Sequence, residues 1–229
     1  MTEPRPTSPD VAEWIESRLD TSRSAKLSAY VPRGFDRLIR VLHPAGDGRS
    51  WEEVAEANGT TVHRLADWFR ISRQPGLSRI GDKDPEEGSV PASVLSAILD
   101  HCPGSGEILQ GVWDGFGSWS EEPGSERPAR GYYIFTTPRA PFYAWPGMDP
   151  HWPQSANRIW PPDHNWFIAT DIDLDSTLVA GPSSLADALL ADERLETYEL
   201  NYDDELTLWS DSINPPPAHL RPRPDTETS

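Results

Sequence analysis

The sequence has little cysteine and no long apolar segment, and both shortages restrict its class. The single cysteine, Cys102, excludes an internal disulfide, which is typical of proteins from reducing compartments. No apolar run approaches the ~18 residues that a membrane helix needs. Residues 1–10 also lack the apolar core of a signal peptide. We therefore expect a cytoplasmic protein without a membrane segment.

The sequence patterns of familiar catalytic and cofactor sites are also missing. There is no phosphate-binding P-loop, no G-x-S-x-G and no G-x-G-x-x-G. The histidines do not follow a metal-ligand spacing such as H-x-x-x-H. His101 and Cys102 are adjacent, and adjacent side chains on a helix point apart, so we interpret Cys102 as a buried thiol. We predict no catalytic residue, metal or cofactor, and whether the chain is an enzyme stays open.

Lysine is scarce too, being limited to Lys26 and Lys83, whereas acidic residues are abundant and unevenly distributed. The net charge is −17 at pH 7, and residues 84–229 hold 7 Lys and Arg against 25 Asp and Glu. Such a surface repels nucleic-acid phosphate and anionic lipid, and it favours cations or basic partners. The same charge can serve solubility alone, so both interpretations stay open.

The aromatic content and the apolar pattern predict a folded α+β protein. The chain has 10 Trp, 6 Tyr and 6 Phe, which supply large apolar areas for a core. Short strand-like and helix-like segments alternate without a βαβ rhythm, which favours a mainly antiparallel sheet with several short helices packed on it. We expect one domain over residues 10–214, between disordered Pro-rich segments at residues 1–9 and 215–229.

The expected elements follow from capping residues and apolar periodicity. Ser50 and Glu53 form a capping box that predicts a helix ending near Gly59. The other predicted helices cover residues 10–19, 61–69, 89–101 and 183–191. The predicted strands cover residues 27–31, 35–42, 108–116, 132–136, 166–173, 177–180 and 197–200, and the pattern of residues 35–42 is also compatible with a helix.

An acidic run ends the most apolar of these predicted strands. If the backbone is extended there, Asp171, Asp173 and Asp175 share one face and repel one another unless solvent or a basic partner meets them. We interpret them as candidate partner-binding residues, and a solvated sheet face is the alternative.

Two other interpretations of this run have weaker support. The segment from Asp173 to Thr177 resembles the D-x-D-x-T motif of haloacid-dehalogenase-type phosphatases. The lysine that this family needs is absent from the residues that follow. Acids at positions 1, 3 and 5 also match a calcium loop, but Ser176 and Pro182 replace the Gly and Glu that such a loop uses.

A long segment rich in Trp and Pro covers residues 138–166. Long ordered loops are often functional, and exposed Trp rings can stack on a flat ligand or on a partner's side chain. A pocket under this loop would make the protein a small-ligand-binding protein or an unrecognised enzyme. The candidate ligand-binding residues are Trp145, Trp152, Trp160, Asp163 and His164. The alternative is that the Trp residues form a small core that fixes the loop.

Residues 51–69 resemble a helix-turn-helix in their apolar pattern. The chemistry fits DNA poorly, because the first helix is acidic and phosphate contacts dominate DNA affinity. Arg64, Arg70 and Arg73 are the candidate DNA-binding residues. A helical hairpin packed into the core is the alternative.

Three blocks of the sequence resemble a family of uncharacterised, Trp-rich acidic proteins common in high-GC actinobacteria. The blocks are residues 31–45, residues 113–117 (WDGFG) and residues 160–177 (WPPDHNWFIATDIDLDST). The resemblance covers roughly residues 27–214. It implies no catalytic residues, because no activity is established for that family.

Three functions are compatible with these observations. We favour a non-catalytic protein-recognition module, like an immunity protein or inhibitor, that presents an acidic face to a basic partner. The alternative is a ligand-binding protein or enzyme with a pocket under residues 138–166. The third is a DNA-associated regulator, although nucleic acid is an unlikely partner for so acidic a chain.

Overall fold

One antiparallel sheet forms the centre of the molecule. The computed structural model describes residues 3–22, 26–72, 84–117, 119 and 131–216. The sheet has eight strands in the order β1-β4-β3-β5-β6-β7-β2-β8, and every neighbouring pair is antiparallel. The predicted α+β class is therefore confirmed. The strands are β1 (Arg5–Thr7), β2 (Arg37–Leu42), β3 (Glu107–Trp113), β4 (Tyr132–Pro138), β5 (Arg158–Trp160), β6 (Phe167–Ala169), β7 (Ser176–Gly181) and β8 (Thr197–Leu200).

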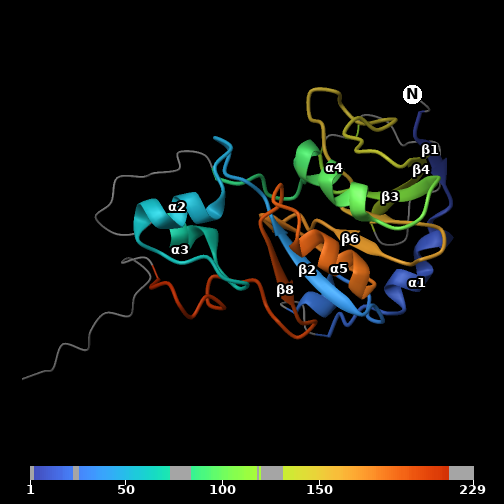
Figure 1. Cartoon of the computed structure of the whole chain (residues 1–229). Helices are drawn as coiled ribbons and strands as arrows, with labels where there is room; N and C mark the ends of the chain where they lie inside the picture. Colours follow the sequence, from blue (N-terminus) through green and yellow to red (C-terminus); the bar gives the residue numbers. More distant parts are fainter. Residues whose placement is uncertain (1–2, 23–25, 73–83, 118, 120–130, 217–229) are drawn as a thin grey trace, which may run out of the picture.

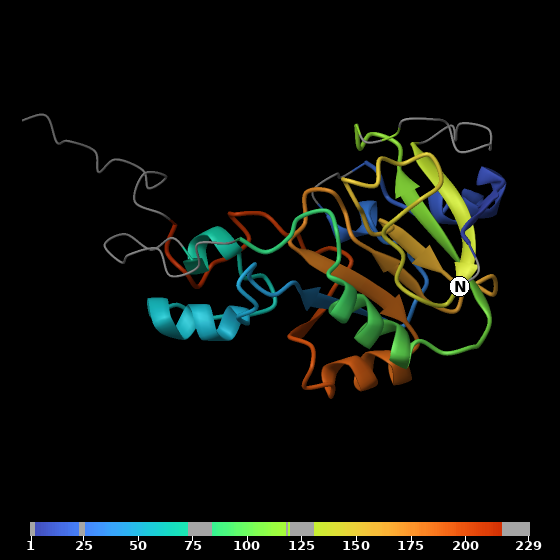
Figure 2. The same ribbon diagram turned by 90° about the horizontal axis from the view of Figure 1, so that it is seen from above.

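Short helices cover both faces of the sheet and form a lobe at one end (Figures 1 and 2). They are η1 (Pro9–Ala12), α1 (Glu13–Glu16), η2 (Leu27–Ala29), α2 (Trp51–Asn58), α3 (Trp68–Ser72), α4 (Ala92–His101) and α5 (Ser183–Leu190). We call residues 51–72, which contain α2 and α3, the helical lobe. None of the helices in the described ranges is both long and apolar enough to cross a membrane.

Alternation along the strands divides the core into two layers. In β2, Ile39 and Val41 pack with α4 and α5, whereas Leu38 packs on the opposite face with residues near α1 and η2. In β7, Val179 and Leu178 repeat this division. Successive side chains of a strand point to opposite faces, so each strand contributes to both layers. The helical lobe has its own small core around Trp51 and Trp68.

Local signals placed several elements correctly. The Ser50–Glu53 capping box is present, and Gly59 ends α2 in the left-handed conformation with φ of 66°. Residues 35–42 contain a strand, β2, and not a helix. The strands predicted in residues 108–116 and 132–136 are β3 and β4, which pair with each other. The strand expected at residues 197–200 is β8.

The predicted second helix of the helix-turn-helix is wrong. Residues 61–67 are not helical, and α3 begins only at Trp68. The backbone N–H of Thr61 instead donates to the side chain of Asn214 at 2.9 Å. The Asp67 carboxylate accepts the N–H of Arg70 at 3.1 Å, which fixes the start of the helix there. Contacts with the distant chain segment near residue 214 therefore override the local helical pattern.

The beginning of the chain also differs from expectation. Arg5–Thr7 lie within the segment expected to be disordered, but they pair with β4 as β1. Residues 27–31 contain the 3₁₀ helix η2 instead of a strand. The helix expected at residues 10–19 is divided into η1 and α1, and the one expected at residues 89–101 begins at Ala92, after Pro91. Of the tail expected at residues 215–229, residues 217–229 lie outside the described residues.

A buried arginine joins the helical lobe to the sheet. Arg40 lies in β2 and is 2% exposed. Its guanidinium donates to Ser176 Oγ at 3.0 Å and to the carbonyl of Ala66 at 2.8 Å, and it pairs with the Asp175 carboxylate at 3.2 Å. It also lies over the Trp51 ring, 5.2 Å from the ring centroid. Because a buried charge needs such partners, Arg40 fixes how these segments pack.

Replacing Arg40 should therefore destabilise the fold strongly. Arg40→Met would leave the Asp175 carboxylate and the Ala66 carbonyl without their donor, and we expect a loss of about 3–5 kcal/mol. Urea unfolding followed by Trp fluorescence would measure it. Arg37→Met, on the same strand but paired with Asp187 and Glu199 at the surface, is the control and should have a much smaller effect. Equal losses would contradict a special role for Arg40.

Candidate functional site

The predicted acidic run does not form one face. Asp171, Asp173 and Asp175 lie in the connection between β6 and β7, because β6 ends at Ala169 and the chain turns back into β7. Asp175 is paired with Arg40, Asp171 is partly buried and Asp173 is exposed. The expected strand over residues 166–173 is therefore too long, and residues 177–180 run antiparallel to it. A basic partner could reach only part of this set.

The Trp residues of the 138–166 loop have different environments. Trp145 is 3% exposed and Trp160 is fully buried, so both belong to the core, as the alternative interpretation of the loop expected. Trp152 is 66% exposed. His164 has a positive φ of 56° and stacks on Trp14 with ring centroids 4.3 Å apart. The predicted ligand-binding residues are thus not brought together.

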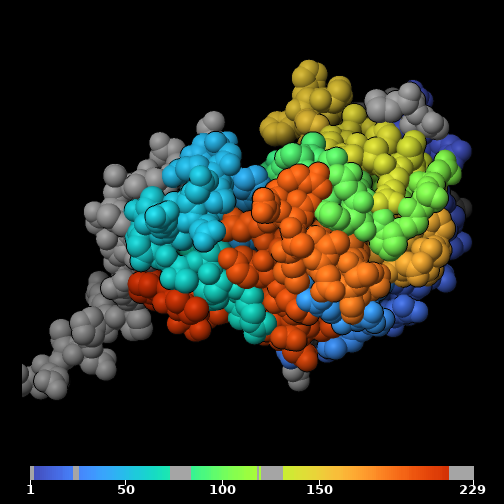
Figure 3. Space-filling model, viewed as in Figure 1, coloured from blue at the N-terminus to red at the C-terminus, as the bar shows by residue number. Residues whose placement is uncertain are grey.

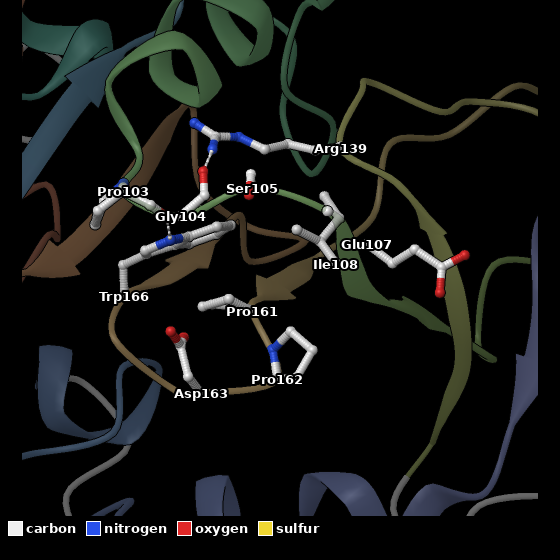
Figure 4. A pocket seen from close by; sticks show the side chains of 11 residues that line it. Pro103, Gly104, Ser105, Glu107, Ile108, Arg139, Pro161, Pro162, Asp163 and Trp166 are labelled. Atoms are coloured by element: carbon white, nitrogen blue, oxygen red, sulfur yellow. Dashed lines mark hydrogen bonds between the residues drawn. The ribbon is translucent and has the colours of Figure 1, made fainter.

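A pocket of about 390 Å³ lies beside the end of this loop (Figure 4). Of the predicted ligand-binding residues, only Asp163 lines it. The Arg139 guanidinium donates to the carbonyls of Leu99, Cys102 and Gly104, so its donors are already used in the protein. The other lining residues are Pro103, Ser105, Gly106, Glu107, Ile108, Pro161, Pro162 and Trp166. Glu107 also pairs with Arg5, at 2.6 Å, so Asp163 is the charged lining residue without an ion pair among the described residues.

The candidate DNA-binding arginines are not available as a basic surface. Arg64 pairs with Asp204. Arg70 is 5% exposed and donates to the carbonyl of Asn214 at 2.5 Å. Arg73 lies outside the described residues. Neither described arginine therefore presents a free guanidinium to a phosphate backbone.

The largest of the described pockets, about 600 Å³, separates the helical lobe from the helices on the sheet. Figure 3 shows the side of the molecule on which the helical lobe (cyan) stands beside the part that contains α4 (green) and α5 (orange). We call this pocket the acidic cleft. Its apolar lining comes from Leu42, Pro44, Val94 and Leu195, and its charged lining from Glu52, Glu193, Arg194 and Glu196; Gly48, Ser50 and Ser93 complete it.

The carboxylate of Glu196 lies at the N-terminus of α2. It accepts the backbone N–H groups of Trp51 and Glu52 at 2.7 and 2.9 Å. Burial raises the pKa of this carboxyl, the two N–H groups oppose that effect, and the charges of Glu52 and Glu53 raise the pKa further. Like charges are thus concentrated here at a free-energy cost that a cation would reduce.

The positive charge at the cleft is already neutralised. Arg194 pairs with Asp192 at 2.7 Å and with Asp100 at 2.9 Å. By contrast, the structure assigns no cationic partner to Glu52 or Glu193 among the residues it describes. The lining contains no His, Cys or Lys, and no group of His, Cys, Asp and Glu in the described ranges could hold a metal ion. The cleft thus combines carboxylates that have no cationic partner among the described residues with apolar side chains.

Sequence reasoning missed this cleft because its acids are far apart in the chain. Glu52 and Glu196 are 144 positions apart, and each has an ordinary local explanation. Glu52 is an acidic residue in the first turn of a helix, and Glu196 precedes a strand. The capping box predicts the acidic start of α2 correctly. It does not indicate which residues lie across the cleft from that helix start.

Cys102 is expected to be unreactive in the folded protein. Burial raises the pKa of its thiol to about 12, so the reactive thiolate is rare at neutral pH. Because the chain has a single cysteine, a disulfide reagent such as DTNB reports on this thiol alone. We expect labelling at pH 8 to be at least about 100-fold slower in the native protein than in urea. Rapid labelling of the native protein would contradict the buried environment.

Comparison with known proteins does not add a relationship to this geometry. No family model matches the chain, and neither does any curated protein or solved structure. The resemblance to Trp-rich actinobacterial proteins therefore stays a prediction, and the function has to be argued from the cleft itself.

Proposed function

We propose that this protein is a non-catalytic recognition module that binds a basic segment of another protein in the acidic cleft. The observation that carries the proposal is the lining of the cleft, which combines apolar side chains with carboxylates that lack a cationic partner among the described residues. This keeps the predicted kind of partner but places its binding site away from Asp171, Asp173 and Asp175.

The apolar lining favours long cationic side chains over small ions. Lys and Arg carry apolar stems that can pack on the partly exposed Pro44 and Leu195 while their charged ends meet Glu52 and Glu193. A volume of about 600 Å³ is large enough for more than one such side chain. A bare cation would use the carboxylates but gain nothing from the apolar surface.

The negative charge of the cleft also distinguishes this proposal from the two alternative functions, nucleic-acid binding and small-ligand binding. The same carboxylates repel phosphate, which argues against nucleic acid. The pocket beside Asp163 is the second candidate, as a small-ligand site. It is smaller, and its arginine is bound to three backbone carbonyls. The acidic cleft is therefore better suited than the pocket beside Asp163 to bind a basic segment of a partner.

Removing two carboxylates from the cleft should weaken binding. The probe is a fluorescein-labelled peptide of alternating Arg and Ala residues, followed by fluorescence anisotropy at low salt. For Glu52→Gln/Glu193→Gln we expect a loss of about ten-fold in affinity. The control is Glu13→Gln/Glu205→Gln, which removes two exposed acids elsewhere, one of them also in the first turn of a helix. If both variants lose affinity equally, the peptide responds to net charge and the cleft is not the site.

Binding should also depend on the protonation of Glu196. Its raised pKa means that this carboxyl takes up a proton at a higher pH than an ordinary Glu. A cationic side chain favours the ionised form, so affinity should fall as the pH falls through the raised pKa. Anisotropy titrations between pH 7 and pH 4 would measure this. In Glu196→Gln the decrease should shift to lower pH, and an unchanged profile would exclude Glu196 from the site.

A further inference from the structure

A third, smaller cavity lies on the other side of the sheet, away from the acidic cleft. Its volume is about 120 Å³, and it is formed where β4 and β5 begin and β6 ends, next to η2. Two of its residues, Tyr30 and Tyr132, pack against the core layer that includes α1. The cavity is lined by Ala29, Tyr30, Tyr132, Asn157, Arg158, Ala169, Thr170 and Asp171.

Asp171 gives this cavity a carboxylate that is only partly compensated. One of its oxygens accepts the backbone N–H of Asp173 at 3.2 Å. The neighbouring cation, Arg158, is engaged by Glu16 at 2.8 Å. Burial raises the pKa of the Asp171 carboxyl and the charge of Asp173 adds to this effect, whereas the N–H of Asp173 and the charge of Arg158 oppose it. The described residues thus place a half-buried anion here without an ion pair of its own.

The two tyrosines supply groups that suit a cation. The Tyr30 hydroxyl has no hydrogen-bond partner in the described part of the chain, and its pKa is raised by burial and by the charges of Asp171 and Asp173. Arg158 lies over the Tyr132 ring, 4.0 Å from the centroid, so this aromatic face already stabilises positive charge. The Tyr132 ring is thus already occupied by the Arg158 guanidinium, which leaves the Asp171 carboxylate and the Tyr30 hydroxyl as the groups that can meet an added cation.

We infer that this cavity binds a primary ammonium group, carried either by a small amine or by a lysine side chain. The ammonium donates one hydrogen bond to the Asp171 carboxylate and another to the Tyr30 hydroxyl oxygen. A compact head group with donors in several directions matches the small volume better than a planar guanidinium, which presents its donors in a fixed fork. Asp173 stands exposed beside the cavity and attracts the cation toward it.

Isothermal titration with n-butylamine and with Nα-acetyl-lysine amide tests this inference. The wild-type protein should bind at least one of these amines, and Asp171→Asn should weaken that binding about ten-fold or more, because it removes a charged hydrogen-bond acceptor. Tyr30→Phe should weaken it by a few-fold. Asp10→Asn, a change of the same kind at an exposed acid outside the pockets described above, should leave it unaltered.

The outcomes separate the possible ligands. Binding of n-butylamine alone indicates a small amine, whereas stronger binding of the lysine derivative indicates a protein side chain. No binding of either amine, equal binding by Asp171→Asn, or a preference for methylguanidinium overturns the inference. If Asp171→Asn does not fold, Tyr30→Phe decides. The Glu52→Gln/Glu193→Gln variant should retain amine binding, which separates this site from the acidic cleft.

Discussion

The buried guanidinium of Arg40 is the interaction on which the arrangement of the molecule depends. A charge in the core is tolerated only when its donors are satisfied, and here they are satisfied by two different segments. Asp175 and Ser176 lie where β7 begins, and Ala66 lies in the helical lobe. Arg40 thus determines where the lobe sits against the sheet, and the acidic cleft exists because of that position.

The same use of arginine explains why negative charge remains at the surface. The described arginines are largely committed to carboxylates or carbonyls; Arg37 and Arg194, for example, each engage two acids. With 37 acidic residues against 20 Lys and Arg, many carboxylates must remain without an internal partner. Solvent can stabilise an isolated carboxylate. Glu52 and Glu193 line a cleft together with apolar side chains, and there we propose that a partner's cation stabilises the carboxylates better than solvent does.

Elements of this fold that depend on contacts between neighbouring residues can be predicted from the sequence, whereas those that depend on contacts between distant residues cannot. The capping box at Ser50 and Glu53 acts within one helical turn, so α2 was predictable. Residues 61–69 were misplaced because Thr61 bonds to Asn214, 153 positions away. The strand expected over residues 166–173 ends at Ala169, and the turn that follows leads to Asp175, which pairs with Arg40, 135 positions away. The acidic cleft was hidden for the same reason, since its two walls come from separate parts of the chain.

In the proposed site, Glu196 can hold the start of α2 and still accept a hydrogen bond from a cation. A carboxylate has about four lone-pair sites, and the backbone N–H groups of Trp51 and Glu52 use one on each oxygen. The remaining sites can accept a hydrogen bond from a cation without loss of the bonds that hold α2. Binding therefore requires no rearrangement of the lobe. A site that is already formed loses little conformational entropy on binding, so a modest number of ion pairs can suffice for recognition.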